Sequence, residues 1–244
     1  MSDQPPNNDI SSNRYTIIFM VILSVTCALI LSVFASALSG PKQEARELDR
    51  YKQMMIAAKI LSYEGYFLIK NEKGEHVPAK YSEGGTLVAG NNEEIATSKQ
   101  ILDIYNKRII PLLVDDKGGV TTFAKTGIQE KEYLSDYKKV GYYKPPLKLL
   151  YKLLPNPKKG EKVDDPMKAP PEGWIIPLNG YGLWDAIYGY LALQPDADTV
   201  IGITWYDQKE TPGLGANIAE ASWQNLFPGK VIFQENADGT TDFK

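Results

Sequence analysis

The chain is poor in the two residues that most often build metal and redox sites. Its 244 residues contain one cysteine and one histidine. An internal disulfide and a cysteine-built zinc or iron–sulfur site are thereby excluded, and a histidine-dependent triad is disfavoured. The sequence also has no G-x-S-x-G element, which argues against hydrolase and protease chemistry. No metal site and no catalytic residue are therefore predicted.

An excess of positive charge, the usual mark of nucleic-acid binding, is also missing. The formal net charge is -3 and the pI is about 5.4, so no nucleic-acid partner is indicated. Proline and glycine, in contrast, are plentiful, with 16 and 20 residues among many short apolar runs. This composition favours a loop-rich domain with strands over a helical bundle, and the fold class that we predict is α+β.

One long apolar run stands near the N-terminus. Residues 15–38 carry no charge, and about 20 apolar residues in a helix suffice to cross a bilayer. The competing interpretation is a cleaved signal peptide, since Ala35-Ser36-Ala37 is similar to a small-residue cleavage site. The run is longer than the roughly 7–15 apolar residues of a signal peptide. We therefore expect a single transmembrane helix over 15–38, preceded by a short tail, 1–14, and anchored in a lipid bilayer.

Residues 39–130 are expected to form the N-terminal part of a soluble domain. Apolar residues recur at helical spacing over 48–61, and the methionines there are interpreted as core residues. A short strand is predicted over 66–70. A further helix is predicted over 93–113, where Pro111 should kink the helix or end it by the preceding residue.

Residues 131–171 are rich in lysine and proline. Between Lys131 and Lys168 there are ten lysines and five acidic residues, a local charge of +5. We predict a solvent-exposed excursion with a short helix over 147–154, in which one helical face carries Leu147, Leu150, Tyr151 and Leu154. The basic surface fits anionic lipid headgroups or an acidic partner, and a merely solvated loop is an equal alternative.

Residues 172–244 hold the most distinctive pattern. Apolar residues alternate over 185–193 and 200–206, which predicts an antiparallel hairpin. A glycine-rich loop follows at 210–215, and a helix is predicted over 219–227. Backbone N–H groups of such a loop and a helix start after it are suited to an anion.

Two glycines stand ahead of the hairpin. Gly180 and Gly182 permit backbone conformations closed to other residues, and a tight approach to another group is expected there.

The order Gly-Leu-Trp at 182–184, a strand pair and Glu-Thr-Pro-Gly-Leu-Gly at 210–215 resembles the flavin-binding domain of the C subunit of the sodium-translocating NADH:quinone oxidoreductase. More loosely, it is similar to the equivalent subunit of the Rnf electron-transport complex, the first alternative. The resemblance implies an FMN-binding-type domain within 172–244. It also implies an enzyme-complex subunit of the translocase class, inactive alone, with the other subunits as partners. Electrons would pass from NADH toward quinone through FMN, coupled to Na⁺ export.

The resemblance also implies the cofactor site. Carried over by position, Trp184 would pack near the isoalloxazine ring of FMN. The pocket would further be lined by Glu210, Thr211, Leu214 and Gly215. An aromatic face and apolar walls suit a flavin ring.

One family feature is not found in this sequence. In the family, FMN is esterified to the threonine of a Ser-Gly-Ala-Thr motif, which the 244 residues lack. Thr240 and Thr241 fall in an expected hairpin turn and are rejected as substitutes. We expect that the sequence is truncated before the attachment segment. A membrane-anchored scaffold or binding protein without flavin is the alternative from another class.

The membrane orientation is predicted differently by charge and by the resemblance. Arg14 precedes the apolar run, whereas Lys42, Arg46 and Arg50 follow it, and this balance favours a cytoplasmic C-terminal side. The resemblance implies a cytoplasmic tail and a periplasmic domain anchored in the cell inner membrane. We follow the resemblance, because acidic residues interleave the later positive charges.

Overall fold

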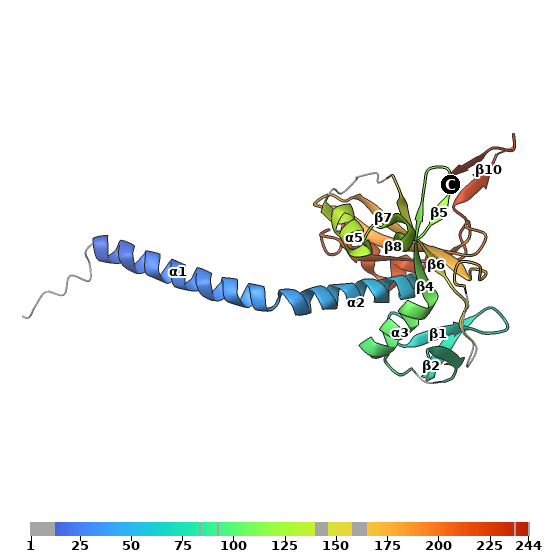
Figure 1. Cartoon of the computed structure of the whole chain (residues 1–244), viewed down its shortest axis with the longest axis horizontal. Helices are drawn as coiled ribbons and strands as arrows, with labels where there is room; N and C mark the ends of the chain where they lie inside the picture. The colour runs from blue at the N-terminus through green and yellow to red at the C-terminus, as the bar shows by residue number, and fades with distance from the viewer. Residues whose placement is uncertain are drawn as a thin grey trace, which may run out of the picture. The chain divides into compact units, whose positions relative to one another are not determined.

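The protein is described by a computed structural model that covers residues 13–82, 84–91, 93–139, 146–157, 165–236 and 238–243. The chain divides into two compact units, residues 1–47 and 48–244. An apolar N-terminal helix is followed by antiparallel sheets and a few helices (Figure 1). The predicted α+β fold class is confirmed.

The first unit contains α1, Asn13–Ala37. This helix is long and apolar enough to cross a membrane. None of its residues is buried, and an apolar helix surface of this kind suits contact with lipid. The candidate span overlaps the predicted segment 15–38.

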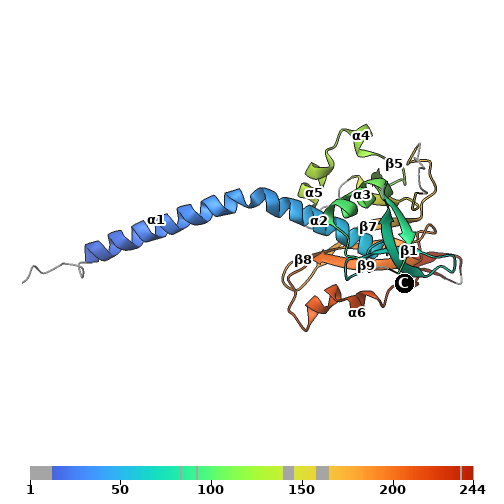
Figure 2. The same cartoon turned by 90° about the horizontal axis from the view of Figure 1, so that it is seen from below.

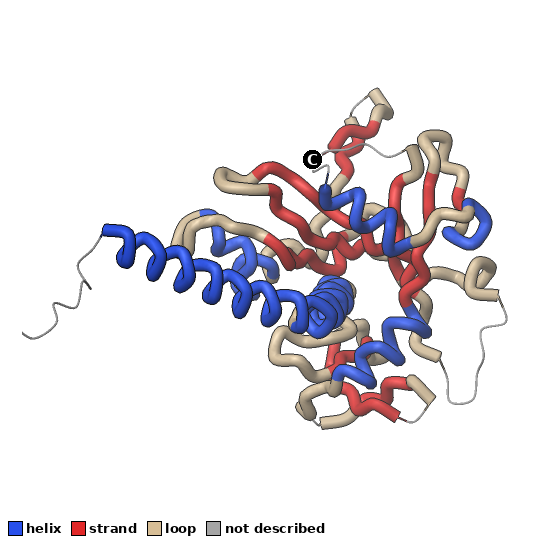
Figure 3. Tube along the Cα trace, turned by 60° about the vertical axis from the view of Figure 1, so that its left-hand side comes forward, coloured by secondary structure: helices blue, strands red, loops and turns tan. Residues whose placement is uncertain are grey.

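A six-stranded antiparallel sheet is the frame of the second unit (Figure 3). Its strand order is β5-β4-β6-β7-β8-β9. The strands are β4 (Ile109–Val114), β5 (Val120–Thr121), β6 (Lys148–Leu153), β7 (Gly173–Tyr181), β8 (Ala186–Leu193) and β9 (Val200–Asp207). The hairpin predicted over 185–193 and 200–206 is confirmed as β8 and β9.

Helix α2, Ser39–Ala57, ends in the hydrophobic core. Met54 and Met55 are fully buried there, which confirms their interpretation as core residues. The last turns of α2 lie against β9, where the Thr204 hydroxyl donates a 3.0 Å hydrogen bond to the Gln53 carbonyl. This contact is the reason that a polar side chain is tolerated inside the sheet.

Strand β6 corrects the prediction made for the lysine- and proline-rich segment. The short helix predicted over 147–154 is wrong, because Lys148–Leu153 pairs with β4 on one side and β7 on the other. Tyr151 and Leu153 are almost fully buried. A strand covered on both faces reads as a continuous apolar run, and such a run also satisfies helical spacing. This part of 131–171 thus lies inside the sheet.

A smaller antiparallel sheet and helix α3 complete the core. The strands are β1 (Phe67–Lys70), β2 (His76–Ser82) and β3 (Thr86–Ala89). Helix α3, Ser98–Arg108, begins with a capping box in which Thr97 accepts from the Gln100 amide. It is shorter than the predicted 93–113 and ends before Pro111, as expected. Pro111 lies in β4 at a position that β5 does not reach, so its missing N–H breaks no pairing there.

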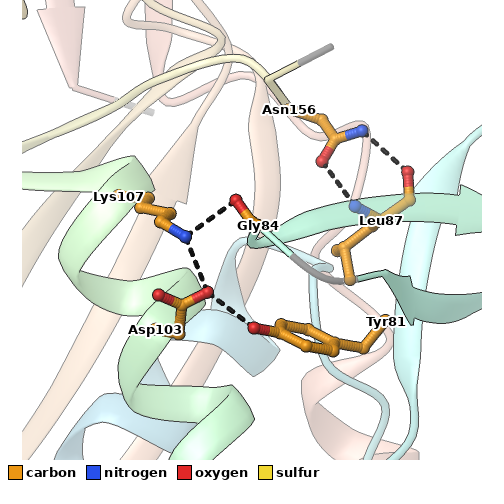
Figure 4. A network of polar contacts seen from close by, with 6 residues as sticks. All are labelled: Tyr81, Gly84, Leu87, Asp103, Lys107 and Asn156. Atoms are coloured by element: carbon orange, nitrogen blue, oxygen red, sulfur yellow. Dashed lines mark hydrogen bonds and ion pairs between the residues drawn. The ribbon is translucent and has the colours of Figure 1, made fainter. Parts of the chain in front are cut away.

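Polar contacts tie the small sheet to its neighbours (Figure 4). The Tyr81 hydroxyl donates a 2.8 Å bond to Asp103 of α3. Lys107 donates to the same carboxylate at 2.8 Å and to the Gly84 carbonyl at 2.7 Å. Burial raises the pKa of Asp103, but the hydrogen bonds from Lys107 and Tyr81 outweigh it and hold that pKa below its ordinary value.

The remaining elements are short. They are α4 (Phe123–Thr126), α5 (Glu130–Lys139), the 3₁₀ helix η1 (Gly215–Ala219), α6 (Ala221–Gln224), β10 (Phe233–Glu235) and β11 (Thr241–Phe243). The predicted helix over 219–227 is therefore too long. Figure 2 places α6 on the side of β8 and β9 opposite α2. The predicted divisions of the soluble region at 39–130, 131–171 and 172–244 remain predictions.

Candidate functional site

The candidate site is built from two loops that the sheet brings together. The Trp184 loop, residues 182–185, joins β7 to β8, and its turn is closed by a 2.9 Å hydrogen bond from Gly182 N to the Asp185 carbonyl. The Glu210 loop, residues 208–215, follows β9. Because β8 is paired with β7 on one side and β9 on the other, the two loops meet at one end of these strands.

The carboxylate of Glu210 joins the two loops. Its Oε1 atom accepts hydrogen bonds from the backbone N–H of Leu183 at 2.9 Å and of Trp184 at 3.2 Å. An ionised acceptor makes such bonds stronger than neutral ones. The Glu210 side chain therefore fixes the backbone of the Trp184 loop.

Two glycines leave room for this carboxylate. A Cβ atom on Gly182 would stand 2.1 Å from Glu210 Oε1, and one on Gly215 would stand 2.9 Å from Glu210 Oε2. Neither glycine has a positive φ, so space rather than backbone freedom explains them. The tight approach predicted at Gly182 is confirmed, whereas a Cβ on Gly180 would meet nothing within 4 Å.

The indole of Trp184 is held by the neighbouring residue of the Glu210 loop. Its Nε1–H donates a 3.1 Å hydrogen bond to the Thr211 hydroxyl. The ring is nevertheless 68% exposed. A large aromatic side chain is thus held in orientation at the surface and stays largely exposed.

Exposed apolar side chains occur on both loops and at the last residue of β7. They are Tyr181, Leu183 and Leu214, each at least 75% exposed. Gly213, with a φ of 77°, has open space at its Cβ position. Exposed apolar groups that gather on adjacent loops commonly mark a binding surface. We call Trp184 and these three exposed side chains the apolar wall.

An ion pair spans the same loops. Lys209 Nζ contacts the Asp185 carboxylate, which also accepts a 2.8 Å bond from the Ala186 amide. The hydrogen bond from Lys209 and then the Ala186 amide lower the pKa of Asp185. Both charged groups are exposed, so the pair contributes more to the local potential than to stability.

Two backbone amides in and just after the glycine-rich loop are used within the loop itself. The N–H groups of Leu214 and Ala216 both donate to the Thr211 carbonyl, at 3.1 and 3.2 Å. The helix that follows, Gly215–Ala219, is a single short 3₁₀ turn. These two amides therefore do not support the predicted anion site, which remains a prediction.

The structure brings most of the predicted site residues into one cluster. Trp184, Glu210 and Thr211 are joined by hydrogen bonds, and Gly215 lies against the Glu210 side chain. Leu214 is exposed on the same loop. The sequence did not lead to the exposed Tyr181 and Leu183 or to the Asp185–Lys209 ion pair. For Tyr181 and Leu183 the one available signal was their position on either side of Gly182.

Comparison with known proteins places the chain among those with an FMN-binding domain. The FMN-binding domain family matches residues 182–243, which include both site loops. The chain is 38% identical to a protein from Chlamydia caviae over all of its length and 78% of the relative, and 36% identical to one from Chlamydia pneumoniae over 96% and 75%. Both relatives are named as the C subunit of the Na(+)-translocating NADH-quinone reductase.

Solved structures give a weaker match. The chain covers 74% of the C subunit from Parabacteroides distasonis with 85% of its own residues, at 20% identity and a TM-score of 0.48. It covers 65% of the Shewanella oneidensis NqrC chain with 58% of its own residues, at 23% identity and a TM-score of 0.45. From the sequence relatives, the chain belongs to the NqrC family, the C subunits of the Na⁺-translocating NADH-quinone reductase. Its members are parts of an enzyme complex, and this chain carries the family's FMN-binding domain.

Proposed function

We propose that this chain carries FMN against the wall formed by the two site loops and relays electrons from NADH toward quinone, coupled to Na⁺ export. The observation that carries the proposal is the exposed Trp184 indole, which Thr211 holds in place inside the region matched by the FMN-binding domain family. The complex belongs to the translocase class, and the isolated chain has no activity of its own.

The wall fits the chemistry of a flavin ring. The ring is planar and largely apolar, and it packs on aromatic and aliphatic faces. Trp184 and Leu214 offer such faces, and the open backbone at Gly213 lets a flat group approach. When bound, FMN supplies reversible one- and two-electron transfer. The residues of this chain that form the site are Trp184, Glu210, Thr211, Leu214 and Gly215.

We infer a covalent attachment through a phosphoester to a threonine, by analogy with the family. The 244 residues contain no Ser-Gly-Ala-Thr sequence, so the attachment threonine is not among those described at the site. With a covalent link, the wall residues would set the position of the flavin ring and would not be needed to retain it.

We further propose that α1 anchors the chain in the cell inner membrane, with the unit that follows in the periplasm. The length and uncharged character of α1 support a bilayer partner. The other subunits of the complex are the protein partners.

The test begins with the complex purified from membranes. After denaturing electrophoresis, ultraviolet light should reveal a fluorescent band at this subunit, and Trp184→Ala should slow NADH-driven quinone reduction. Trp223→Phe is the control, because Trp223 packs against the Phe227 ring outside the site loops. A non-fluorescent subunit in a complex that retains full quinone reduction would reject the proposal.

Sodium coupling and orientation need separate measurements. Inverted vesicles should accumulate Na⁺ when NADH is added, and protease added outside intact spheroplasts should cleave the unit after α1. Protection of that unit from protease would overturn the periplasmic placement.

A further inference from the structure

We infer that Glu210 is a positioning residue, which acts on the flavin through Trp184 rather than by contact. The inference rests on the proposed function, since it assumes FMN on the Trp184 wall. It separates the five site residues into two groups: those that meet the ring and those that hold them in place.

The first observation is where the Glu210 carboxylate lies. Oε1 is occupied by the two backbone amides of the Trp184 loop. Oε2 lies against Gly215, 2.9 Å from its Cβ position. The side chain is partly buried between the loops, in contrast to the exposed Trp184 and Leu214. Its oxygens therefore face the protein on both sides.

The second observation concerns Thr211. Its hydroxyl oxygen accepts from the Trp184 indole, and a hydroxyl also has one proton to donate. No acceptor for that proton is found among the described residues. Thr211 is exposed beside the indole, so its O–H can donate to a ligand that lies on the wall while it still holds Trp184.

Together the two residues clamp one tryptophan from both ends. Glu210 fixes its backbone and Thr211 fixes its ring, so the indole plane is set before a ligand binds. Rigid placement of a contact surface improves binding because less freedom is lost on association. This accounts for adjacent Glu and Thr at the start of 210–215, whose other residues are proline, glycine and leucine.

The clamp can be tested without the flavin. In the full chain in detergent micelles, ¹⁵N-labelled tryptophan gives an indole N–H signal for Trp184, assigned with Trp184→Phe. We expect Thr211→Val to speed exchange of that proton about tenfold, the size of one lost net hydrogen bond. Thr211→Ser, which keeps the hydroxyl, should retain the slow exchange. Equal exchange in wild type and Thr211→Val would overturn the Thr211 half of the clamp.

Glu210 is tested by its shape and its charge separately. Gln keeps an oxygen that can accept both amides, whereas Ala removes it. A positioning role predicts that, in the complex, Glu210→Gln keeps two wild-type properties. These are the quenching of flavin fluorescence by the Trp184 indole and the reduction potential of the flavin. Glu210→Ala should lose the quenching. A shift in potential with Glu210→Gln equal to that with Glu210→Ala would mean direct electrostatic contact and would overturn the inference.

The two proposals fail in different ways. One outcome is a wild-type subunit that lacks flavin while its Trp184 indole N–H still exchanges more slowly than in Thr211→Val. That result rejects the proposed function, and with it the flavin role of Glu210. A subunit with flavin whose quenching is unchanged in Glu210→Ala rejects only the positioning role.

Discussion

The carbonyl oxygen of Ala57 lies 2.5 Å from the point where a Cβ atom on Gly202 would stand. The contact is between two backbones, one at the end of α2 and one in β9. No flexible side chain is involved that could move aside to relieve it. Glycine at 202 is thus required by space, since φ is not positive there. The relationship sets the distance between the helix and the sheet.

Gly202→Ala is expected to destabilise the soluble unit by about 2 kcal/mol, because overpacking of this size forces the backbone to shift. The measurement is urea unfolding of the full chain in detergent, followed by tryptophan fluorescence; all four tryptophans lie within residues 174–223. Gly180→Ala is the matched control, because a Cβ there meets nothing within 4 Å. Equal unfolding midpoints for the two variants would contradict the packing argument.

The buried guanidinium of Arg108 is neutralised by Glu172. Arg108 is 3% exposed, donates to the Leu154 carbonyl at 3.0 Å and contacts the Glu172 carboxylate. Burial lowers the pKa of Arg108, and Glu172 opposes that shift. The Glu172 side chain is itself 37% exposed, so the two partners do not depend on each other equally.

Glu172→Ala should therefore cost about 3 kcal/mol, because it leaves a charge buried without its counter-ion. Arg108→Met should cost less, since the remaining carboxylate keeps contact with water. Urea unfolding of both single variants and the double variant gives the coupling. A larger loss for Arg108→Met would show that packing, not charge burial, dominates.

The low pKa of Asp103 predicts a pH dependence. A carboxyl with a depressed folded-state pKa stabilises the fold above its ordinary value of 3.8, and that contribution is lost as pH falls through the folded-state pKa. Asp103→Asn should thus lower stability near pH 6 by about 0.5–1 kcal/mol and should converge with wild type in acid. Tyr81→Phe, which removes the 2.8 Å bond to Asp103, should give a smaller loss. Parallel pH profiles for wild type and Asp103→Asn would refute the assignment.

Elements with a clear local signal could be predicted from the sequence. Alternation over β8 and β9, the uncharged run of α1 and the helix-ending effect of Pro111 each reflect a short-range constraint. Strand β6 could not, because burial on both faces removes the alternation that identifies a strand. Its neighbours β4 and β7 are distant in sequence, and only the completed sheet reveals the pairing.

The site residues are predicted by resemblance more than by physics. Trp184 and Glu210 are 26 residues apart, and nothing local indicates that a carboxylate on one loop accepts amides of the other. That contact follows from the register of β7, β8 and β9. The same holds for Gly182, where the sequence predicts a tight approach but does not identify the partner.

The last prediction concerns this glycine. A Cβ on residue 182 would stand 2.1 Å from Glu210 Oε1 and 2.9 Å from the Asp185 carbonyl oxygen. Glu210 is the flexible partner, so its carboxylate should move and release the amides of Leu183 and Trp184. Hydrogen exchange of these two amides in Gly182→Ala should then be faster by about tenfold, the ratio that corresponds to one lost net hydrogen bond.

Global stability should change little in Gly182→Ala, since the Trp184 loop is exposed and outside the core. This separates it from Gly202→Ala, where the fold itself is strained. Gly180→Ala, two residues away on the same strand end, should leave the exchange of both amides at the wild-type rate. If it accelerated exchange equally, the protection would come from the turn between β7 and β8, and the Glu210 carboxylate would not be what holds Trp184 in place.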